Sequence, residues 1–247
     1  MLQIRLATPD DRGVILDLIE EAAAWLRTRD TDQWARPWPD EARRDARVLA
    51  GILAGRTWIV MDYGIPVASV TYRPDGNKAL WSKAERNEPA GYMSRLVVSR
   101  KYAGTKVGAA LTDWAGWRSR DEFSADYLRI DVWTTNVRLH RYYEERGFHF
   151  LRFCDDPYYP SAALFYKLTE DIDNSAGRYF WVIPALLAGA RSGELFSRPT
   201  ERSLVQDVDA ASGAARRRPA RTEPIGFLRA AASAAWLCLT SINGLFR

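Results

Sequence analysis

The run from residue 92 to 133 constrains the fold most, because it joins two strand patterns through a glycine turn and a helix. "YMSRLVVSR" is an extended, largely apolar segment, and "YLRIDVW" alternates apolar and polar residues as a strand does. The segment between them places apolar residues on one helical face after Gly104: Val107, Ala110, Leu111, Trp114 and Ala115. This order predicts a strand–helix–strand crossover inside a larger sheet.

The patterns on either side extend this crossover to an α+β domain. Thr8, Pro9 and Asp11 form a capping pattern at the start of a helix that runs to Leu26, and a second helix is expected from Glu41 to Ala54. A further helix begins at Thr135 or Asn136 and stops at Gly147. Strands are expected, besides the two above, at 2–7, 57–64, 65–74, 148–153 and 161–168. The turn between 57–64 and 65–74 predicts an antiparallel hairpin.

The composition changes after Leu168, which predicts a domain over residues 1–168 and an extension over residues 169–247. The extension is expected to be largely disordered with short apolar helical segments, because "SGAARRRPARTEP" is polar and proline-containing. Residues 230–246 carry no charge, but Ser, Asn and Gly dilute them. We expect a tail with a helical end there, and a membrane contact is the weaker alternative.

The charge and cysteine content exclude several classes of function. Thirty-five basic and thirty-one acidic residues give a net charge of +4, which does not indicate a nucleic-acid-binding protein. Two cysteines cannot form a disulfide framework, so a cytoplasmic protein is expected. Two histidines without a CxxC pattern predict no metal site.

The glycine turn "YAGTKVGAAL" has two interpretations. Free amides at a helix start and small residues such as Gly104 and Gly108 suit a phosphate group. A tight turn into a core helix explains the same residues without any ligand. A nucleotide-binding P-loop is excluded because no Gly-Lys-Ser/Thr follows, and the spacing does not supply the GxGxxG of a dinucleotide-binding fold.

Two gapped signatures together resemble the GNAT superfamily of acyl-CoA-dependent N-acyltransferases. "LVVSRKYAGTKVGAAL" resembles the cofactor motif of that family, although Lys106 replaces its middle glycine and Ala103 replaces an Arg or Gln. "TNVRLHRYYEERGF" resembles the second signature, on the residues Asn136, Tyr143, Gly147 and Phe148. The resemblance covers about residues 3–168, and it implies a mixed, mainly antiparallel twisted sheet with flanking helices.

The resemblance also implies an acetyl-CoA site and an N-acetyltransferase activity. The diphosphate is expected on the amides from Ala103 to Ala109, and the pantetheine arm on the main chain of Leu96 to Val98 and on Asn136. The residues implied as cofactor contacts are Leu96, Val97, Val98, Ala103, Gly104, Thr105, Lys106, Val107, Gly108, Ala109 and Asn136.

The catalytic groups are also assigned through this resemblance. Tyr143 is implied as the general acid for the leaving thiolate, whereas its structural alternative is an aromatic that packs the helix on the sheet. The amide of Val98 is expected to polarise the thioester oxygen. The strand before the motif carries no glutamate to act as a base. Asp131 is the candidate, acting through water, with a salt bridge to an arginine as its alternative role.

The acceptor is expected to be a small-molecule primary amine. In this family the loop between the first two helices lines the acceptor pocket, and here it contains Asp32, Gln33, Trp34 and Trp38. Aromatics and a carboxylate suit a cationic amine, although the tryptophans also suit the edge of a core. Trp81 is a similar candidate. The alternatives are a non-catalytic acyl-CoA-binding regulator and a protein-amine acetyltransferase, and a homodimer stays open.

Overall fold

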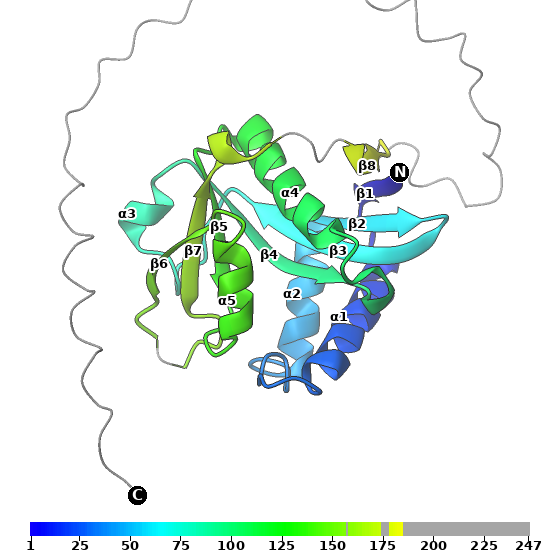
Figure 1. Cartoon of the computed structure of the whole chain (residues 1–247), viewed down its shortest axis with the longest axis horizontal. Helices are drawn as coiled ribbons and strands as arrows, with labels where there is room; N and C mark the ends of the chain where they lie inside the picture. Colours follow the sequence, from blue (N-terminus) through cyan, green and yellow to red (C-terminus); the bar gives the residue numbers. More distant parts are fainter. Residues whose placement is uncertain (157, 174–177, 185–247) are drawn as a thin grey trace, which may run out of the picture. The chain divides into compact units, whose positions relative to one another are not determined.

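The computed structural model of the chain describes residues 1–156, 158–173 and 178–184, all within one unit, Met1–Leu195. Eight strands form one sheet in the order β6-β7-β5-β4-β3-β2-β1-β8 (Figure 1). The strands are β1 (Leu2–Leu6), β2 (Thr57–Asp62), β3 (Ile65–Arg73), β4 (Ala90–Val98), β5 (Tyr127–Val132), β6 (His149–Phe153), β7 (Ala163–Leu168) and β8 (Phe180–Val182). The helices are α1 (Arg12–Leu26), α2 (Glu41–Leu53), α3 (Lys83–Arg86), α4 (Val107–Phe123) and α5 (Val137–Glu144).

The α+β prediction and the crossover are confirmed. The pairs β4–β5 and β1–β8 are parallel, and the other neighbours in the sheet are antiparallel. The parallel pair β4–β5 is joined by α4, as the strand–helix–strand pattern predicts. The sheet is therefore mixed and mainly antiparallel.

The two faces of the sheet bury different helices, and strand alternation decides which. Trp58 faces a core built with α4 and α5, whereas the next residue, Ile59, faces a second core built with α1 and α2. Figure 1 shows α4 lying along β3 and β4. The same alternation in β5 points Ile130 toward α4 and Asp131 toward the face of the sheet that α1 and α2 cover.

Close packing of α4 on the sheet depends on small residues. Gly91 of β4 lies under Ser119 of α4, because a methyl group at Gly91 would be 2.1 Å from the Ser119 hydroxyl oxygen. Gly116 of α4 likewise makes room for Ile172, whose Cδ1 would be 2.2 Å from an added Cβ. These contacts fix the position of the helix whose first turn follows the glycine-containing loop.

The folded unit continues past the expected boundary at residue 168. Thr169–Asp171 form a turn of 3₁₀ helix, Ile172 is buried against α4, and β8 pairs in parallel with β1. The boundary at Leu168 is therefore too early, because a short strand and two buried apolar side chains complete the sheet edge. Residues 185–247, which include the apolar stretch 230–246, lie outside the described residues. In the described part, none of the helices has both the length and the apolarity to cross a membrane.

Candidate functional site

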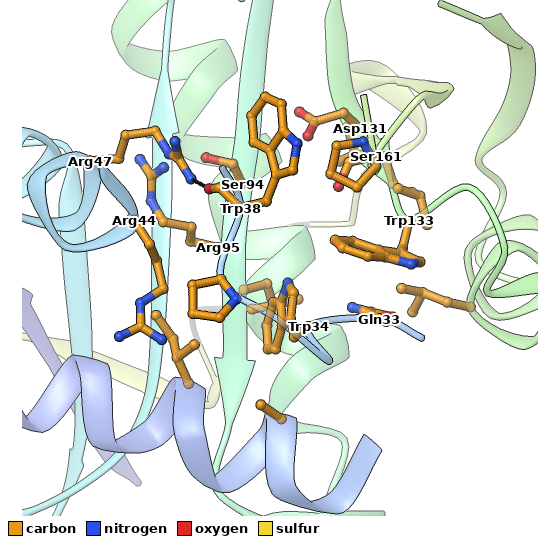
Figure 2. A pocket seen from close by; sticks show the side chains of 18 of the residues that line it. Gln33, Trp34, Trp38, Arg44, Arg47, Ser94, Arg95, Asp131, Trp133 and Ser161 are labelled. Atoms are coloured by element: carbon orange, nitrogen blue, oxygen red, sulfur yellow. Dashed lines mark hydrogen bonds between the residues drawn. The ribbon is translucent and has the colours of Figure 1, made fainter. Parts of the chain in front are cut away.

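Strands β4 and β5 separate in the middle of the sheet and leave an opening there. Their parallel pairing covers Ala90–Met93 against Tyr127–Ile130, but β4 continues to Val98. A cavity of about 220 Å³ lies at this opening. Figure 2 shows side chains from both strands and from the α1–α2 loop around it. Residues of α1, α2 and α5 also line it, so the cavity connects the two faces of the sheet.

Tyr143 reaches this cavity from α5. Its side chain is 7% exposed and packs edge to face against Tyr142 and Phe148, with ring centroids 5.3 Å apart in each pair. Burial raises the pKa of the Tyr143 phenol well above its usual range. Within the part of the chain that the structure describes, the hydroxyl has no hydrogen-bond partner. Tyr143 therefore presents a protonated phenol to the cavity at any working pH.

Asp131 of β5 lines the same cavity. Burial raises the pKa of this carboxyl to about 6, and the positive charges of Arg73 and Arg95 act in the opposite direction. Neither arginine comes within salt-bridge distance of it among the described residues. The salt bridge considered as the alternative role of Asp131 is therefore not formed here. A carboxylate with this pKa is mostly ionised at neutral pH and accepts a proton readily.

Tyr143 and Asp131 interact electrostatically, because the charge of Asp131 also raises the pKa of Tyr143. The two candidate catalytic groups come from different elements, α5 and β5, and meet at the opening between β4 and β5. The arrangement offers one proton donor and one proton acceptor at the same cavity.

The glycine-containing loop adopts the backbone that its motif requires. Gly104 and Lys106 have positive φ angles of 79° and 65°. Lys106 thus has the left-handed conformation that glycine adopts most readily, and it precedes the first residue of α4. The amides of Ala103 and Thr105 donate to the carbonyls of Arg100 and Tyr102. The amides of the first turn, residues 106–109, therefore remain for a ligand.

The side chains of β4 and of the glycine-containing loop differ in how accessible they are to a cofactor. Leu96 lines the cavity, and Val98 is half-buried. The side chains of Val97, Val107 and Ala109 are buried in the cores, so only their main chains can contact a cofactor. A Cβ on Gly108 would lie 3.8 Å from the Tyr142 hydroxyl, which places Tyr142 beside the start of α4. These positions fit a phosphate-bearing cofactor at the α4 start with its arm along β4.

The α1–α2 loop borders the cavity, as expected, through Gln33, Trp34 and Trp38. Trp38 packs against Tyr159 with ring centroids 4.6 Å apart, and Trp34 also packs on the core of α1 and α2. Their positions are thus compatible with both of the expected roles, in the wall of the cavity and at the edge of the core.

Asp32 and Asn136 tie this loop to the segment after β5. Asp32 accepts hydrogen bonds from Trp133 Nε1, at 2.8 Å, and from Thr135. Asn136 caps α5 by accepting from the Leu139 amide at 3.0 Å, and it donates to Gln33 Oε1 at 2.6 Å. These bonds lower the pKa of Asp32, and Asp32 is not among the described residues that line the cavity. The expected contact of Asn136 with pantetheine would use its second amide hydrogen.

Trp81 is not brought to the cavity. It is 2% exposed and packs at 5.4 Å, centroid to centroid, against Tyr92 in a separate core under the Arg129 guanidinium. A buried side chain there cannot contact an acceptor in the cavity. The expectation that Trp81 binds the substrate is corrected for this reason.

The lining side chains that were not identified from the sequence include Arg95, Arg47 and Trp133. Arg95 has a positive φ of 50° where the register of β4 against β3 shifts, which is a β-bulge. The signal available was an arginine inside an otherwise apolar strand, in "YMSRLVV". Arg47 donates to the carbonyl of Trp38 and lies over its ring at 5.6 Å.

Comparisons with known proteins agree with this geometry. A sequence model described as the Acetyltransferase (GNAT) family matches residues 19–148, just over half of the chain. A Bacillus subtilis protein described as "Uncharacterized N-acetyltransferase YesJ" is 27% identical over 149 residues, which cover 59% of this chain and 80% of that protein.

Solved structures share the fold. A GNAT family acetyltransferase from Listeria monocytogenes matches with a TM-score of 0.54 and 22% identity, over 68% of this chain and 94% of that one. The PaiA N-acetyltransferase from Thermoplasma acidophilum, solved in complex with coenzyme A, matches with a TM-score of 0.52 and 14% identity, over 68% and 99%.

Proposed function

The chain belongs to the GNAT family of acetyltransferases, and we propose that it transfers an acetyl group from acetyl-CoA to the primary amine of a small molecule. The observation that supports this most is the meeting of Tyr143 and Asp131 at one cavity, in the opening beside β4. The cavity measures about 220 Å³, which suits a small acceptor better than a folded protein surface.

The residues present fit acetyl-CoA, which supplies the acetyl group as a thioester. The first-turn amides of α4 and the helix dipole favour the negative charge of its diphosphate. No side chain lies within 4 Å of a Cβ built on Gly104, so the loop is open at this point. The Lys106 ammonium adds positive charge at the same place. The free edge of β4 beyond Met93 offers main-chain groups to the pantetheine arm, as proposed for Leu96 to Val98.

The proposed mechanism assigns one proton to each of two residues. The neutral acceptor amine attacks the thioester carbonyl, so that an N–C bond forms and the C–S bond breaks. The Val98 amide is the proposed donor to the carbonyl oxygen. Asp131 accepts the proton that the attacking nitrogen loses, directly or through water, and Tyr143 donates its phenolic proton to the departing thiolate. The proton held by Asp131 returns to solvent, and Tyr143 is reprotonated from solvent.

The alternative of a non-catalytic acyl-CoA-binding regulator rests on the lack of a base on the motif strand and on the altered loop at Ala103 and Lys106. Asp131, one strand away, lines the cavity with a pKa of about 6, which supports the catalytic proposal over that alternative. The test is release of free thiol from acetyl-CoA in the presence of a panel of primary amines. Cofactor binding without thiol release on every amine would support the regulator instead.

Tyr143→Phe tests the acid role, and Tyr142→Phe is the matched control. Loss of the Tyr143 hydroxyl should lower kcat by about tenfold or more, while the dissociation constant of coenzyme A stays the same. Tyr142 lies one residue away beside the start of α4, so its variant should retain kcat within about threefold. Equal rates for the wild type and Tyr143→Phe would exclude the proposed acid.

A further inference from the structure

Arg95 lines the acceptor cavity, and its guanidinium extends toward α2, where Nη2 would be 3.4 Å from a Cβ built on Gly51. In β4, Ser94 pairs with Thr71 and Val97 pairs with Ser69, so Arg95 and Leu96 together oppose one residue of β3. This bulge interrupts the alternation of the strand, and Ser94, Arg95 and Leu96 all line the cavity. Figure 2 shows the Arg95 side chain beside those of Arg47 and Arg44.

No described carboxylate forms a salt bridge with Arg95, although the charge of Asp131 acts on its guanidinium. Its Nε is buried without a hydrogen-bond partner, and among the described residues its guanidinium takes part in no salt bridge. Burial lowers the pKa of Arg95 to about 10, the charges of Arg73 and Arg47 act in the same direction, and the charge of Asp131 acts in the opposite direction. The side chain is therefore still a cation at neutral pH. A half-buried cation whose Nε has no hydrogen-bond partner is costly to the protein, which is typical of a group that is kept to bind a ligand.

The other lining arginines are exposed or paired, and Arg36 is one of the exposed ones. Arg44 makes salt bridges with Glu20, Glu41 and Asp45. Arg47 is exposed and is held by the Trp38 carbonyl and ring. Asp131 is the one carboxylate besides Glu20 among the described lining residues. The cavity thus retains an anionic group, Asp131, and a cationic group, Arg95, on neighbouring strands and without a salt bridge between them.

Building on the proposed function, we propose that the acceptor is an amine that carries a carboxylate, of the amino-acid type. Its carboxylate binds the Arg95 guanidinium, and its amine lies toward Asp131 and Tyr143. Guanidinium groups bind carboxylates through two parallel hydrogen bonds, which fixes the orientation of a small molecule. In the view of Figure 2, the Trp38 ring lies between Asp131 and Arg95, where it would contact the body of the acceptor.

This proposal narrows the expected primary amine to one that also carries a carboxylate. The carboxylate that was expected to attract a cation, Asp32, is bonded to Trp133 and Thr135 instead of lining the cavity. A molecule with a net positive charge would meet Arg95 without compensation. A zwitterion meets both charges of the cavity.

The test compares matched acceptors with the full-length protein and acetyl-CoA, with thiol release as the readout. Leucine, leucinamide and 3-methylbutylamine share one side chain, and phenylalanine, phenylalaninamide and 2-phenylethylamine share another. Where a set is turned over, kcat/KM for the acid should exceed that for the amide by about 30-fold or more. The amide has the less basic amine, so amine ionisation alone would favour the amide. The aminophosphonate analogue of leucine distinguishes a carboxylate site from a general oxyanion site.

Arg95→Met should remove this preference, and Arg36→Met is the control. Arg36 also lines the cavity but is exposed, so its loss lowers the positive charge without touching Arg95. Arg95→Met should lower kcat/KM for the acids about 30-fold more than for the amides, whereas Arg95→Lys should recover part of the difference. Loss of the Arg95 charge also raises the pKa of Asp131, so both acceptor sets are compared at a pH well above 6, and Tm is measured for each variant.

Calorimetric titration of the amino acids into the protein with coenzyme A present separates the two proposals. Amino-acid binding that Arg95→Met abolishes, without thiol release from any amine, supports the carboxylate site and contradicts the acetyltransferase mechanism. Thiol release with amines and amides at rates equal to the acids, unchanged in Arg95→Met, supports the mechanism and overturns the carboxylate site. A phosphonate preferred over its carboxylate by tenfold or more overturns the assignment of a carboxylate.

Discussion

Lys106 holds a backbone conformation that residues with a side chain rarely adopt. Its φ of 65° is the left-handed region, which costs an L-residue about 1–2 kcal/mol. Lys106→Gly removes this strain but adds freedom to the unfolded chain, worth about 0.4–1 kcal/mol. We expect the free energy of unfolding to rise by about 0.5–1 kcal/mol, measured by urea denaturation. Lys106→Gln keeps the strain, so its free energy of unfolding should not rise.

The same pair of variants separates the backbone of Lys106 from its charge in cofactor binding. Both variants lack the ammonium group, so both should weaken coenzyme A binding by several-fold at low ionic strength, and the difference should shrink as salt is added. The measurement is a calorimetric titration at two salt concentrations. Equal affinity of the wild type and both variants would show that Lys106 does not contact the diphosphate.

Asp131 predicts an acid limb in the pH profile of activity. Its pKa of about 6 lies above the ordinary range of an aspartate, so the carboxyl becomes protonated as the pH falls through about 6 and can no longer accept a proton. The groups that influence it are Arg73, Arg95, Tyr143 and Tyr159. Thiol release should fall about tenfold per pH unit below 6. Asp131→Asn should be slow at every pH and should lack this limb, and a limb that persists in it belongs to another group.

Local patterns predicted the site residues that come from regular elements. Tyr143 follows from the spacing of the second signature, and Asp131 from alternation in β5. The position of Arg95 at the cavity could not be predicted in this way. A bulge shifts the alternation of β4 by one residue, and the sequence of a single strand does not show its register with the neighbouring strand. The burial of Trp81 was not predicted, because it depends on Tyr92 of β4 and Arg129 of β5, whereas Trp81 itself lies in the segment before β4.

The close contact between β4 and α4 at Ser119 depends on Gly91, so a substitution of this glycine tests how the two elements pack. Ser119 is 0% exposed, and a Cβ on Gly91 would meet both its hydroxyl oxygen and its Cβ, at 2.1 and 2.3 Å. Gly91→Ala should therefore cost about 2 kcal/mol or more in the free energy of unfolding, as overpacked cores do. Thermal and urea denaturation measure this cost.

Ser119→Gly is the compensating change for Gly91→Ala. It removes both clashing atoms, and the nearest remaining Ser119 atom, Cα, would be 3.6 Å away. Alone it should cost about 1 kcal/mol as a glycine in a helix, besides the hydrogen bond from its hydroxyl to the Ala115 carbonyl. In the double variant, Gly91→Ala should add little, which gives a coupling energy of about 1–2 kcal/mol. If the costs of the two single variants add in the double variant, Gly91→Ala is accommodated by a shift of α4 and not by the Ser119 side chain.

Element boundaries were less predictable than element order. Helix α4 begins at Val107 and not at Gly104, because Thr105 and Ala103 first close a turn on Tyr102 and Arg100. Strand β8 escaped notice because three residues carry no periodic pattern, and its position depends on pairing with β1. Tertiary contacts decide such short elements.

For the whole molecule, we expect one truncation of the C-terminal segment to lower the stability and a shorter truncation to leave it unchanged. A chain of residues 1–184 keeps all described contacts, whereas a chain of residues 1–168 loses Ile172 and Phe180, which are 3% and 4% exposed in the core beside α4. Burial of each side chain contributes about 1.5–3 kcal/mol, and a domain of this kind is stable by only about 5–15 kcal/mol. The chain of residues 1–168 should therefore show a strongly lowered Tm or fail to fold.

The chain of residues 1–184 should match the full chain in Tm and in thiol release, because the cavity and the start of α4 lie within it. Phe180→Ala in the full chain is the control that separates core packing from loss of the following residues, and it should lower the free energy of unfolding by about 3 kcal/mol. A fully stable and active chain of residues 1–168 would contradict the place assigned to β8 in the sheet. Loss of activity in residues 1–184 at unchanged Tm would instead assign a direct part in the reaction to residues 185–247.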